Sequence, residues 1–203
     1  MRIHRRLPRT LLPVLAVAVL LAGCGDSRHW SLKNIEGVMP PLRFRLTDDS
    51  GRPATAGDYR GKVVLLYFGY THCPDVCPTT LAKLAGSLGA LGDRADGVRV
   101  LFVSVDPKRD SATVLHRYVG AFGPQFTGLR GGQDALRTLT RRYRVSYGYG
   151  KPAADGSYEV SHSSAIFIFD RRGRIRLLAQ QDDDARAISH DLRQLLAEPE
   201  ARS

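Results

Sequence analysis

The chain has 203 residues, with 30 Lys and Arg against 20 Asp and Glu, and a formal net charge of +10. Apolar residues make up 43% and charged residues 25%, which is typical of a globular protein and excludes disordered and collagen-like chains. A chain of this length buries enough surface to fold without a disulfide framework. Its three cysteines are therefore candidates for chemistry and not for scaffolding.

Part of the positive charge belongs to the N-terminus. Four basic residues precede residue 10, and no acidic residue occurs before Asp26. Without residues 1–23 the net charge is +6, from 26 basic and 20 acidic residues. The remaining basic residues form no run of five and are not interleaved with aromatic residues, so the sequence does not indicate nucleic-acid binding.

Residues 1–23 have the pattern of a signal peptide. Basic residues precede an apolar run over 11–22, which as a helix would span about 18 Å, less than the roughly 30 Å core of a bilayer. The run ends in Leu21-Ala22-Gly23-Cys24, which resembles the bacterial lipobox. In that motif the peptide is cut before the Cys, which then carries several acyl chains and holds the protein stably on a membrane.

We therefore expect a lipidated Cys24 and an exported chain at the periplasmic face of the inner membrane; the alternative is an unprocessed signal anchor. Thiols outside the cytoplasm tend to be oxidised. With Cys24 assigned to lipid, the mature domain retains two cysteines, Cys73 and Cys77.

The following segments predict an α/β domain over 42–197, preceded by a tether over 24–41 and followed by a tail over 198–203. Continuous apolar runs predict strands buried on both faces at 63–68 and 98–105. Further patterns predict strands at 42–46, 126–129, 164–169 and 174–178 and helices at 79–91, 111–122, 136–143 and 185–196. This order predicts a sheet with helices on both faces.

The segment that carries chemistry lies between the strand at 63–68 and the following helix. It places Cys73 and Cys77 at the carboxyl end of a buried strand, where open α/β sheets hold their sites. Residues four apart share one face of a helical turn. The free N–H groups of a helix N-terminus lower the pKa of a nearby Cys, so we expect this pair to bind a metal or to exchange disulfides.

Two thiolates select Cu(I) or Zn(II), and a further ligand is needed. The candidate histidines are His72, His116, His162 and His190. His72 is adjacent to Cys73, so its side chain is expected to diverge; His116 lies in a predicted helix and His190 on the polar side of another. His162 lies in a Ser-rich stretch at a strand edge, and the residues alone leave the choice open.

Residues 38–197 resemble the Sco (SenC) proteins, copper chaperones of cytochrome oxidase assembly with a thioredoxin-like fold. The segment that resembles the copper motif is Tyr67-Phe68-Gly69-Tyr70-Thr71-His72-Cys73-Pro74-Asp75-Val76-Cys77-Pro78. A second signature is matched by Val103-Ser104-Val105-Asp106-Pro107-Lys108-Arg109-Asp110. Phe126-Thr127-Gly128-Leu129 and Tyr143-Arg144-Val145 follow in the same order.

The resemblance implies a thioredoxin-like fold with a central mixed sheet. It also implies one copper ion per chain, held by Cys73, Cys77 and His162, which aligns with the family's distant His. The ion would be Cu(I), and Cu(II) is compatible with the imidazole and one added ligand. The partner would be the oxidase subunit with the dinuclear copper centre, with a copper donor or thiol reductant acting upstream. In this family an Asp often precedes the His, whereas here the residue is Ser161.

The main alternative is a membrane-anchored thiol-disulfide reductase that keeps the copper-ligand cysteines of the oxidase reduced, with Cys73 and Cys77 as the redox pair. A peroxidase of peroxiredoxin type is disfavoured, because Tyr70 stands where Thr or Ser is usual three residues before the reactive Cys. A structural zinc site lacks an evident fourth ligand, and no phosphate-binding Gly motif indicates a nucleotide site.

Overall fold

The computed structural model describes residues 29–154 and 156–199. Its main sheet has eight strands, which are β1 (Lys33–Asn34), β2 (Arg45–Asp48), β3 (Pro53–Thr55), β4 (Val63–Gly69), β5 (Val98–Ser104), β6 (Phe126–Arg130), β9 (Ile166–Phe169) and β10 (Ile175–Ala179). Across the sheet their order is β1-β10-β9-β4-β5-β6-β2-β3. The central strands β4, β5 and β6 are parallel, whereas β9 runs antiparallel to β4.

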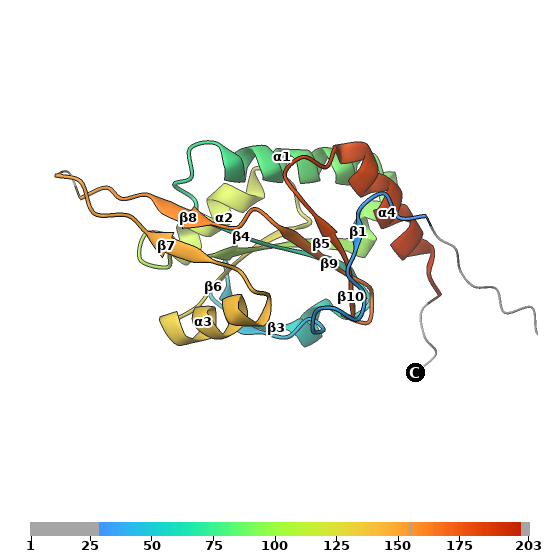
Figure 1. Ribbon diagram of the computed structural model, residues 1–203, viewed down its shortest axis with the longest axis horizontal. Helices are drawn as coiled ribbons and strands as arrows, with labels where there is room; N and C mark the ends of the chain where they lie inside the picture. The colour runs from blue at the N-terminus through green and yellow to red at the C-terminus, as the bar shows by residue number, and fades with distance from the viewer. Residues whose placement is uncertain (1–28, 155, 200–203) are drawn as a thin grey trace, which may run out of the picture.

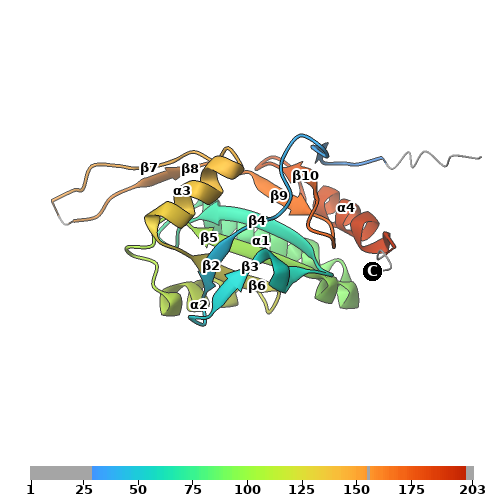
Figure 2. The same cartoon turned by 90° about the horizontal axis from the view of Figure 1, so that it is seen from below.

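Helices cover both faces of this sheet. They are α1 (Val76–Gly89), α2 (Ala112–Gly120), α3 (Gln133–Arg142) and α4 (Ala185–Ala197). Figure 1 shows α1 and α4 on one face and α3 on the other, and Figure 2 shows the same sheet from below. The mixed sheet between two helical layers confirms the predicted α/β class. All residues of β4 are buried, as its continuous apolar run predicts.

The element boundaries differ from the prediction in one way that matters for chemistry. Helix α1 begins at Val76 and not near Thr79, so Cys77 lies in its first turn. The short elements β1, β3, β7 (Tyr147–Tyr149), β8 (Val160–His162) and the 3-10 helices at Ala56–Tyr59 and Gly92–Gly97 were not predicted. Strands β7 and β8 pair only with each other in a separate two-stranded sheet among the described residues.

The described part of the expected tether over 24–41 is instead packed on the domain. Leu32 is buried, and β1 pairs antiparallel with β10. The carboxylate of Asp191, on α4, accepts hydrogen bonds from the backbone N–H groups of Ser31 at 3.0 Å and Leu32 at 2.8 Å. The Arg176 guanidinium lies over the Trp30 ring, 5.4 Å from its centre. This segment is therefore a strand at the sheet edge.

The expected signal peptide over 1–23, Cys24 and most of the tail over 198–203 lie outside the described residues. Within 29–154 and 156–199, the helices are all too short or too polar to span a bilayer.

Replacing Asp191 by Ala is expected to lower the free energy of unfolding by about 1–3 kcal/mol, because two backbone N–H groups lose their buried acceptor. Urea denaturation followed by tryptophan fluorescence measures this, and Trp30, the single tryptophan, reports on the docked segment itself. Asp182→Ala, which removes an exposed carboxylate of equal charge, is the control. Equal stability of the two variants would show that Asp191 does not hold the segment.

Candidate metal centre

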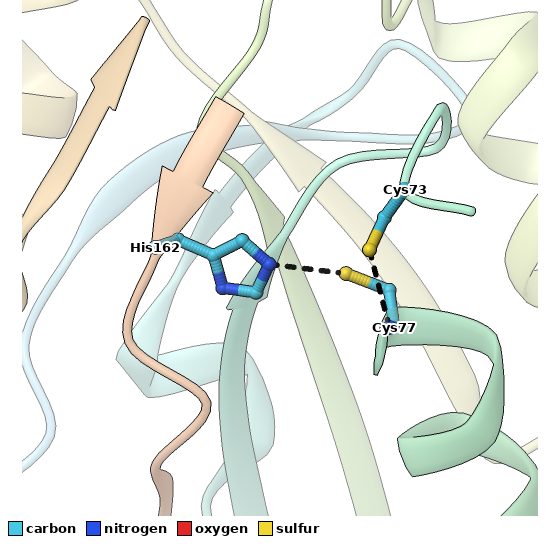
Figure 3. Close-up of side chains that lie close together, drawn as sticks. All are labelled: Cys73, Cys77 and His162. Atoms are coloured by element: carbon cyan, nitrogen blue, oxygen red, sulfur yellow. Dashed lines mark hydrogen bonds between the residues drawn. The ribbon is translucent and has the colours of Figure 1, made fainter. Parts of the chain in front are cut away.

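The structure brings together three of the residues singled out in the sequence. Cys73 lies in the loop after β4, Cys77 in the first turn of α1, and His162 at the end of β8. Their ligand atoms all lie within 4.8 Å of one another, and Figure 3 shows the three side chains converging from these separate segments. Among the described residues this is the single cluster of three or more His, Cys, Asp or Glu side chains with such spacing.

Cys77 is the buried member of the cluster. Its sulfur has no exposed surface and accepts a hydrogen bond from the Tyr67 hydroxyl at 3.7 Å. Burial raises the pKa of the Cys77 thiol to about 12. The expectation that the helix N-terminus lowers this pKa is therefore wrong, because the loss of hydration outweighs the effect of the helix. In the metal-free protein at neutral pH, Cys77 is a protonated thiol.

Gly69, the last residue of β4, makes room for that sulfur. A Cβ atom added to Gly69 would lie 2.9 Å from the Cys77 Sγ and 2.6 Å from the Phe102 ring. Both distances are shorter than real contacts, so only glycine fits at this position without a shift of the surrounding atoms. Gly69 was not predicted as a site residue, and the one signal in the sequence is its position between a buried strand and the Cys pair.

Cys73 is more accessible and receives the helix N–H group. Its side chain is half-buried, and its Sγ accepts a hydrogen bond from the backbone N–H of Cys77 at 3.4 Å. That N–H lies in the first turn of α1, where it has no partner within the helix. The contact with a free N–H group of the helix N-terminus, which was expected for the Cys pair, is therefore made by the sulfur of Cys73.

His162 is oriented with its Nε2 toward the sulfur of Cys77. Its Nδ1 lies 3.0 Å from the carbonyl oxygen of Ser163, which can only accept, so Nδ1 carries the proton. The unprotonated Nε2 then faces the Cys77 Sγ at 3.3 Å. Burial lowers the pKa of His162, which keeps the ring in the neutral form that a metal ligand requires.

Ser161 does not supply the orienting contact that an Asp before this His could make. Its side chain is exposed, and its hydroxyl donates to the carbonyl of Gly148 on β7 at 3.4 Å. The next carbonyl along the chain, that of Ser163, holds the His162 ring instead. With Ser in place of Asp at position 161, a backbone carbonyl therefore orients the His162 ring.

The other three candidate histidines lie outside this cluster. His72 is half-exposed and contacts the hydroxyl of Thr71 at 3.1 Å. His116 is largely exposed beside Asp49, and His190 contacts Asp191 at 2.8 Å. This placement agrees with the expectation that the side chain of His72 diverges from that of Cys73. His162 is the histidine that joins the two cysteines in the cluster.

The cluster opens into a cleft of about 800 Å³. Cys73 and His162 line it, together with Tyr70, Arg109 and Tyr158, whereas Cys77 lies beneath. Two sulfurs and one imidazole nitrogen at this spacing can hold one soft metal ion with three ligands. They can also form a disulfide after a modest movement of the loop.

Comparison with known proteins identifies the relatives of this arrangement. The model of the SCO1/SenC family matches residues 40–197. The chain is 41% identical to the mitochondrial SCO2 homolog of Mus musculus over 132 residues, which is 64% of the chain and 52% of the mouse protein. It is 35% identical to the SCO2-like protein RP587 of Rickettsia prowazekii over 132 residues, 64% of either protein. The chain thus spans about half to two thirds of the length of such relatives.

Solved structures agree with the fold. The structure of Bradyrhizobium japonicum ScoI with copper bound superposes with a TM-score of 0.70 at 36% identity, over 77% of this chain and 99% of that one. The solution structure of apo Sco1 from Thermus thermophilus gives a TM-score of 0.72 at 36% identity, over 84% of this chain and 99% of that one. These similarities confirm the predicted thioredoxin-like fold of the Sco proteins.

Replacing Gly69 by Ala is expected to lower the free energy of unfolding by about 1–3 kcal/mol, because the Phe102 ring or the Cys77 sulfur must move. The matched control is Gly86→Ala, where an added Cβ meets no atom within 4 Å and helix propensity favours Ala by up to about 1 kcal/mol. Chemical denaturation compares the two variants. A parent-like stability of Gly69→Ala would contradict the tight contact.

The two thiols of the reduced protein are expected to differ in reactivity. Limiting N-ethylmaleimide at pH 8 should modify Cys73 faster than Cys77, on the order of tenfold or more, because Cys77 is buried with a raised pKa. Mass analysis of the digested protein locates the label. Denatured protein, in which the two thiols are equally accessible, is the control, and equal labelling in the folded state would rule out the burial described for Cys77.

Proposed function

The chain belongs to the SCO1/SenC family, and we propose that it binds one copper ion through Cys73, Cys77 and His162 and delivers it to the dinuclear copper centre of cytochrome c oxidase. The observation that carries the proposal is the convergence of two sulfurs and an unprotonated imidazole nitrogen within 4.8 Å. The ScoI structure from Bradyrhizobium japonicum, 36% identical to this chain, is described as having copper bound.

The donor set fits copper chemically. Thiolates are soft ligands that favour Cu(I), and the single imidazole also suits Cu(II) with a further ligand. The hydrogen bond from His162 Nδ1 to the Ser163 carbonyl leaves Nε2 ready to donate its electron pair to the ion. The Cys77 thiol gives up its proton when it binds the ion, so copper competes with protons at this ligand.

The burial of the ligands supports delivery by direct contact. Cys73 and His162 line the cleft, and Cys77 lies beneath them. An acceptor that enters the cleft therefore reaches two of the three ligands first and can replace them one at a time. Transfer then ends at Cys77, where protonation of the buried thiol favours release of the ion.

We also propose that lipid on Cys24 anchors the protein to the periplasmic face of the inner membrane. The support is the lipobox-like Leu21-Ala22-Gly23-Cys24 after a short apolar run. Anchoring on the membrane that holds the oxidase raises the local concentration of the donor near its acceptor. The mass of the mature N-terminus distinguishes a lipidated Cys24 from an unprocessed anchor.

A second function, reduction of the copper-ligand disulfide of the oxidase, is favoured by one observation. The pair consists of a half-buried thiol and a fully buried one. In such a pair Cys73 attacks the partner disulfide, and Cys77 then displaces the reduced partner as the Cys73–Cys77 disulfide forms. Two electrons pass from the pair to the partner, and an upstream thiol reductant restores the dithiol.

Anaerobic titration of the reduced protein with Cu(I) is expected to give about one ion per chain, abolished by Cys73→Ser or Cys77→Ser. His162→Ala should weaken binding by about tenfold or more, because a well-oriented ligand is lost. His72→Ala is the matched control, since His72 is adjacent to Cys73 in sequence but lies outside the cluster.

The same variants separate the two functions. Loss of copper affinity in His162→Ala with unchanged disulfide exchange supports the copper site. Copper binding that none of these substitutions alters would refute the copper site. Copper binding that is lost in the Cys variants but unchanged in His162→Ala would favour the reductase.

A further inference from the structure

The hairpin that carries His162 is not part of the main sheet. Strands β7 and β8 are hydrogen-bonded to each other, with Tyr147 opposite His162 and Tyr149 opposite Val160. Figure 1 shows this hairpin extending beyond the edge of the main sheet. The position of His162 relative to the two sulfurs therefore depends on the contacts that hold the hairpin to the body of the protein.

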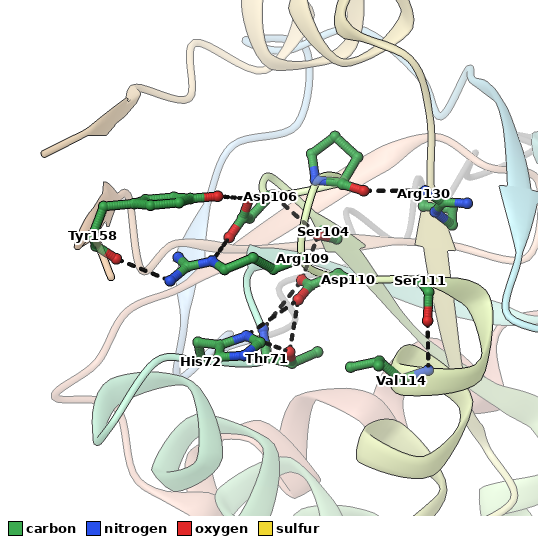
Figure 4. Close-up of polar contacts among 11 residues, drawn as sticks. Thr71, His72, Ser104, Asp106, Arg109, Asp110, Ser111, Val114, Arg130 and Tyr158 are labelled. Carbon is green, nitrogen blue, oxygen red and sulfur yellow. Dashed lines mark hydrogen bonds and ion pairs between the residues drawn. The ribbon is translucent and has the colours of Figure 1, made fainter. Parts of the chain in front are cut away.

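Arg109, in the loop between β5 and α2, makes the most extensive of these contacts. Its Nη1 donates to the backbone carbonyl of Tyr158, two residues before β8, at 3.0 Å. Its guanidinium lies over the Tyr158 ring, 3.7 Å from the ring centre. Its Nε donates to the carboxylate of Asp106, whose other oxygen accepts from the Tyr158 hydroxyl at 2.8 Å. Figure 4 shows this closed ring of contacts.

The same loop holds the segment that carries Cys73. The buried carboxylate of Asp110 accepts from the backbone N–H of Thr71 at 3.1 Å and from the Thr71 hydroxyl at 2.6 Å. It also accepts from the Ser104 hydroxyl at 2.5 Å, at the end of β5. The β5–α2 loop thus contacts the Cys segment through Asp110 and the His hairpin through Asp106 and Arg109.

We propose that Arg109 is a positioning residue, which holds β8 against the β5–α2 loop and so sets the distance between His162 and the two cysteine sulfurs. It contacts none of the three ligands and acts through the backbone of Tyr158. This inference rests on the proposed copper site for its affinity readout, but the structural part of it applies to the metal-free protein as well.

Two further contacts hold the hairpin but differ in what they fix. The Tyr149 hydroxyl donates to the Val105 carbonyl at 2.5 Å, which fixes β7. The Tyr70 ring packs edge-on against the His162 imidazole, with ring centres 5.9 Å apart, and so contacts β8 from the side of the Cys segment. Arg109 is the side chain of the β5–α2 loop that donates directly to the backbone leading into β8, so its loss loosens the His162 strand while β7 stays attached.

The contacts require an arginine. One planar guanidinium reaches a carboxylate through Nε and a carbonyl through Nη1 while its face covers an aromatic ring. A lysine ammonium keeps the charge but cannot make this set of contacts at once. Arg109→Lys therefore retains the positive charge near the cleft but loses this set of simultaneous contacts.

The test is a double-mutant cycle on Cu(I) affinity with Arg109→Ala and His162→Ala. If Arg109 acts by placing His162, Arg109→Ala weakens binding about tenfold in the parent and less than about twofold in the His162→Ala background. Arg109→Lys, which preserves charge, should show the same dependence on His162. Arg130→Ala is the matched control, because Arg130 donates to the Pro107 carbonyl of the same loop at 3.1 Å without a described contact to the hairpin.

A readout on the metal-free protein separates this inference from the proposed function. Amide hydrogen exchange at residues 160–163 should accelerate in Arg109→Ala and Arg109→Lys, while exchange in the first turns of α1 stays at the parent rate. Equal loss of affinity in both backgrounds, or no loss in either, overturns the positioning role, as does unchanged exchange at 160–163. A parent protein that binds no copper refutes the proposed function and leaves the exchange experiment to decide the role of Arg109.

Discussion

The candidate metal centre depends on the parallel pairing of β4 with β5. Their register places Gly69 opposite Ser104, so both strands end at the same edge of the sheet. The backbone continues this pairing one step further, where the N–H of Val105 donates to the carbonyl of Gly69 at 2.8 Å. The loop with Cys73 and the loop with Asp106 and Arg109 therefore emerge side by side, and the polar contacts between them follow from that proximity.

Burial gives the two cysteines different roles at this edge. The sulfur of Cys77 lies close to Gly69, where a larger side chain would collide with it, whereas Cys73 lines the cleft. A thiolate buried there without a metal would lose its hydration, which is why the pKa of Cys77 is raised to about 12. Each fall of one pH unit below that value makes the thiolate about tenfold scarcer, so acid weakens metal binding at this ligand. His162 adds less to this weakening in acid, because its lowered pKa keeps the imidazole neutral to lower pH.

The parts of the molecule that the sequence predicts are those encoded locally. The buried strands at 63–68 and 98–105 are continuous apolar runs, and the Cys pair lies directly after the first of them. The pKa of Cys77 was predicted in the wrong direction because a helix N-terminus is visible in the sequence, whereas the surroundings of its sulfur include residues such as His162, which is 85 positions away along the chain. The docking of residues 31–32 likewise depends on Asp191, about 160 positions away.

The hairpin with His162 is harder to predict for the same reason. Strands β7 and β8 have three residues each, too few to show an apolar pattern. They also contain Gly148 and Ser161, which have low β propensity. Their pairing closes a loop of ten residues, so nothing in either strand alone indicates it. The residues by themselves left four histidines as candidates, and only the resemblance to the Sco proteins singled out His162. The second signature contains Arg109, whose contacts with Tyr158 link the β5–α2 loop to the strand that carries His162.

The division of the ligands between two supports has a chemical consequence. The two cysteines belong to α1 and the loop before it, which are anchored to the sheet, whereas His162 is on a hairpin held largely by polar contacts. Movement of the hairpin can remove the imidazole without disturbing the dithiol, and oxidation of the dithiol to a disulfide removes both sulfur ligands without disturbing the imidazole. Copper affinity can therefore be lowered by movement of the hairpin while the dithiol stays intact. A protein that must first hold copper firmly and then surrender it at its acceptor gains from these two supports, because release can begin at the hairpin while the buried sulfur still holds the ion.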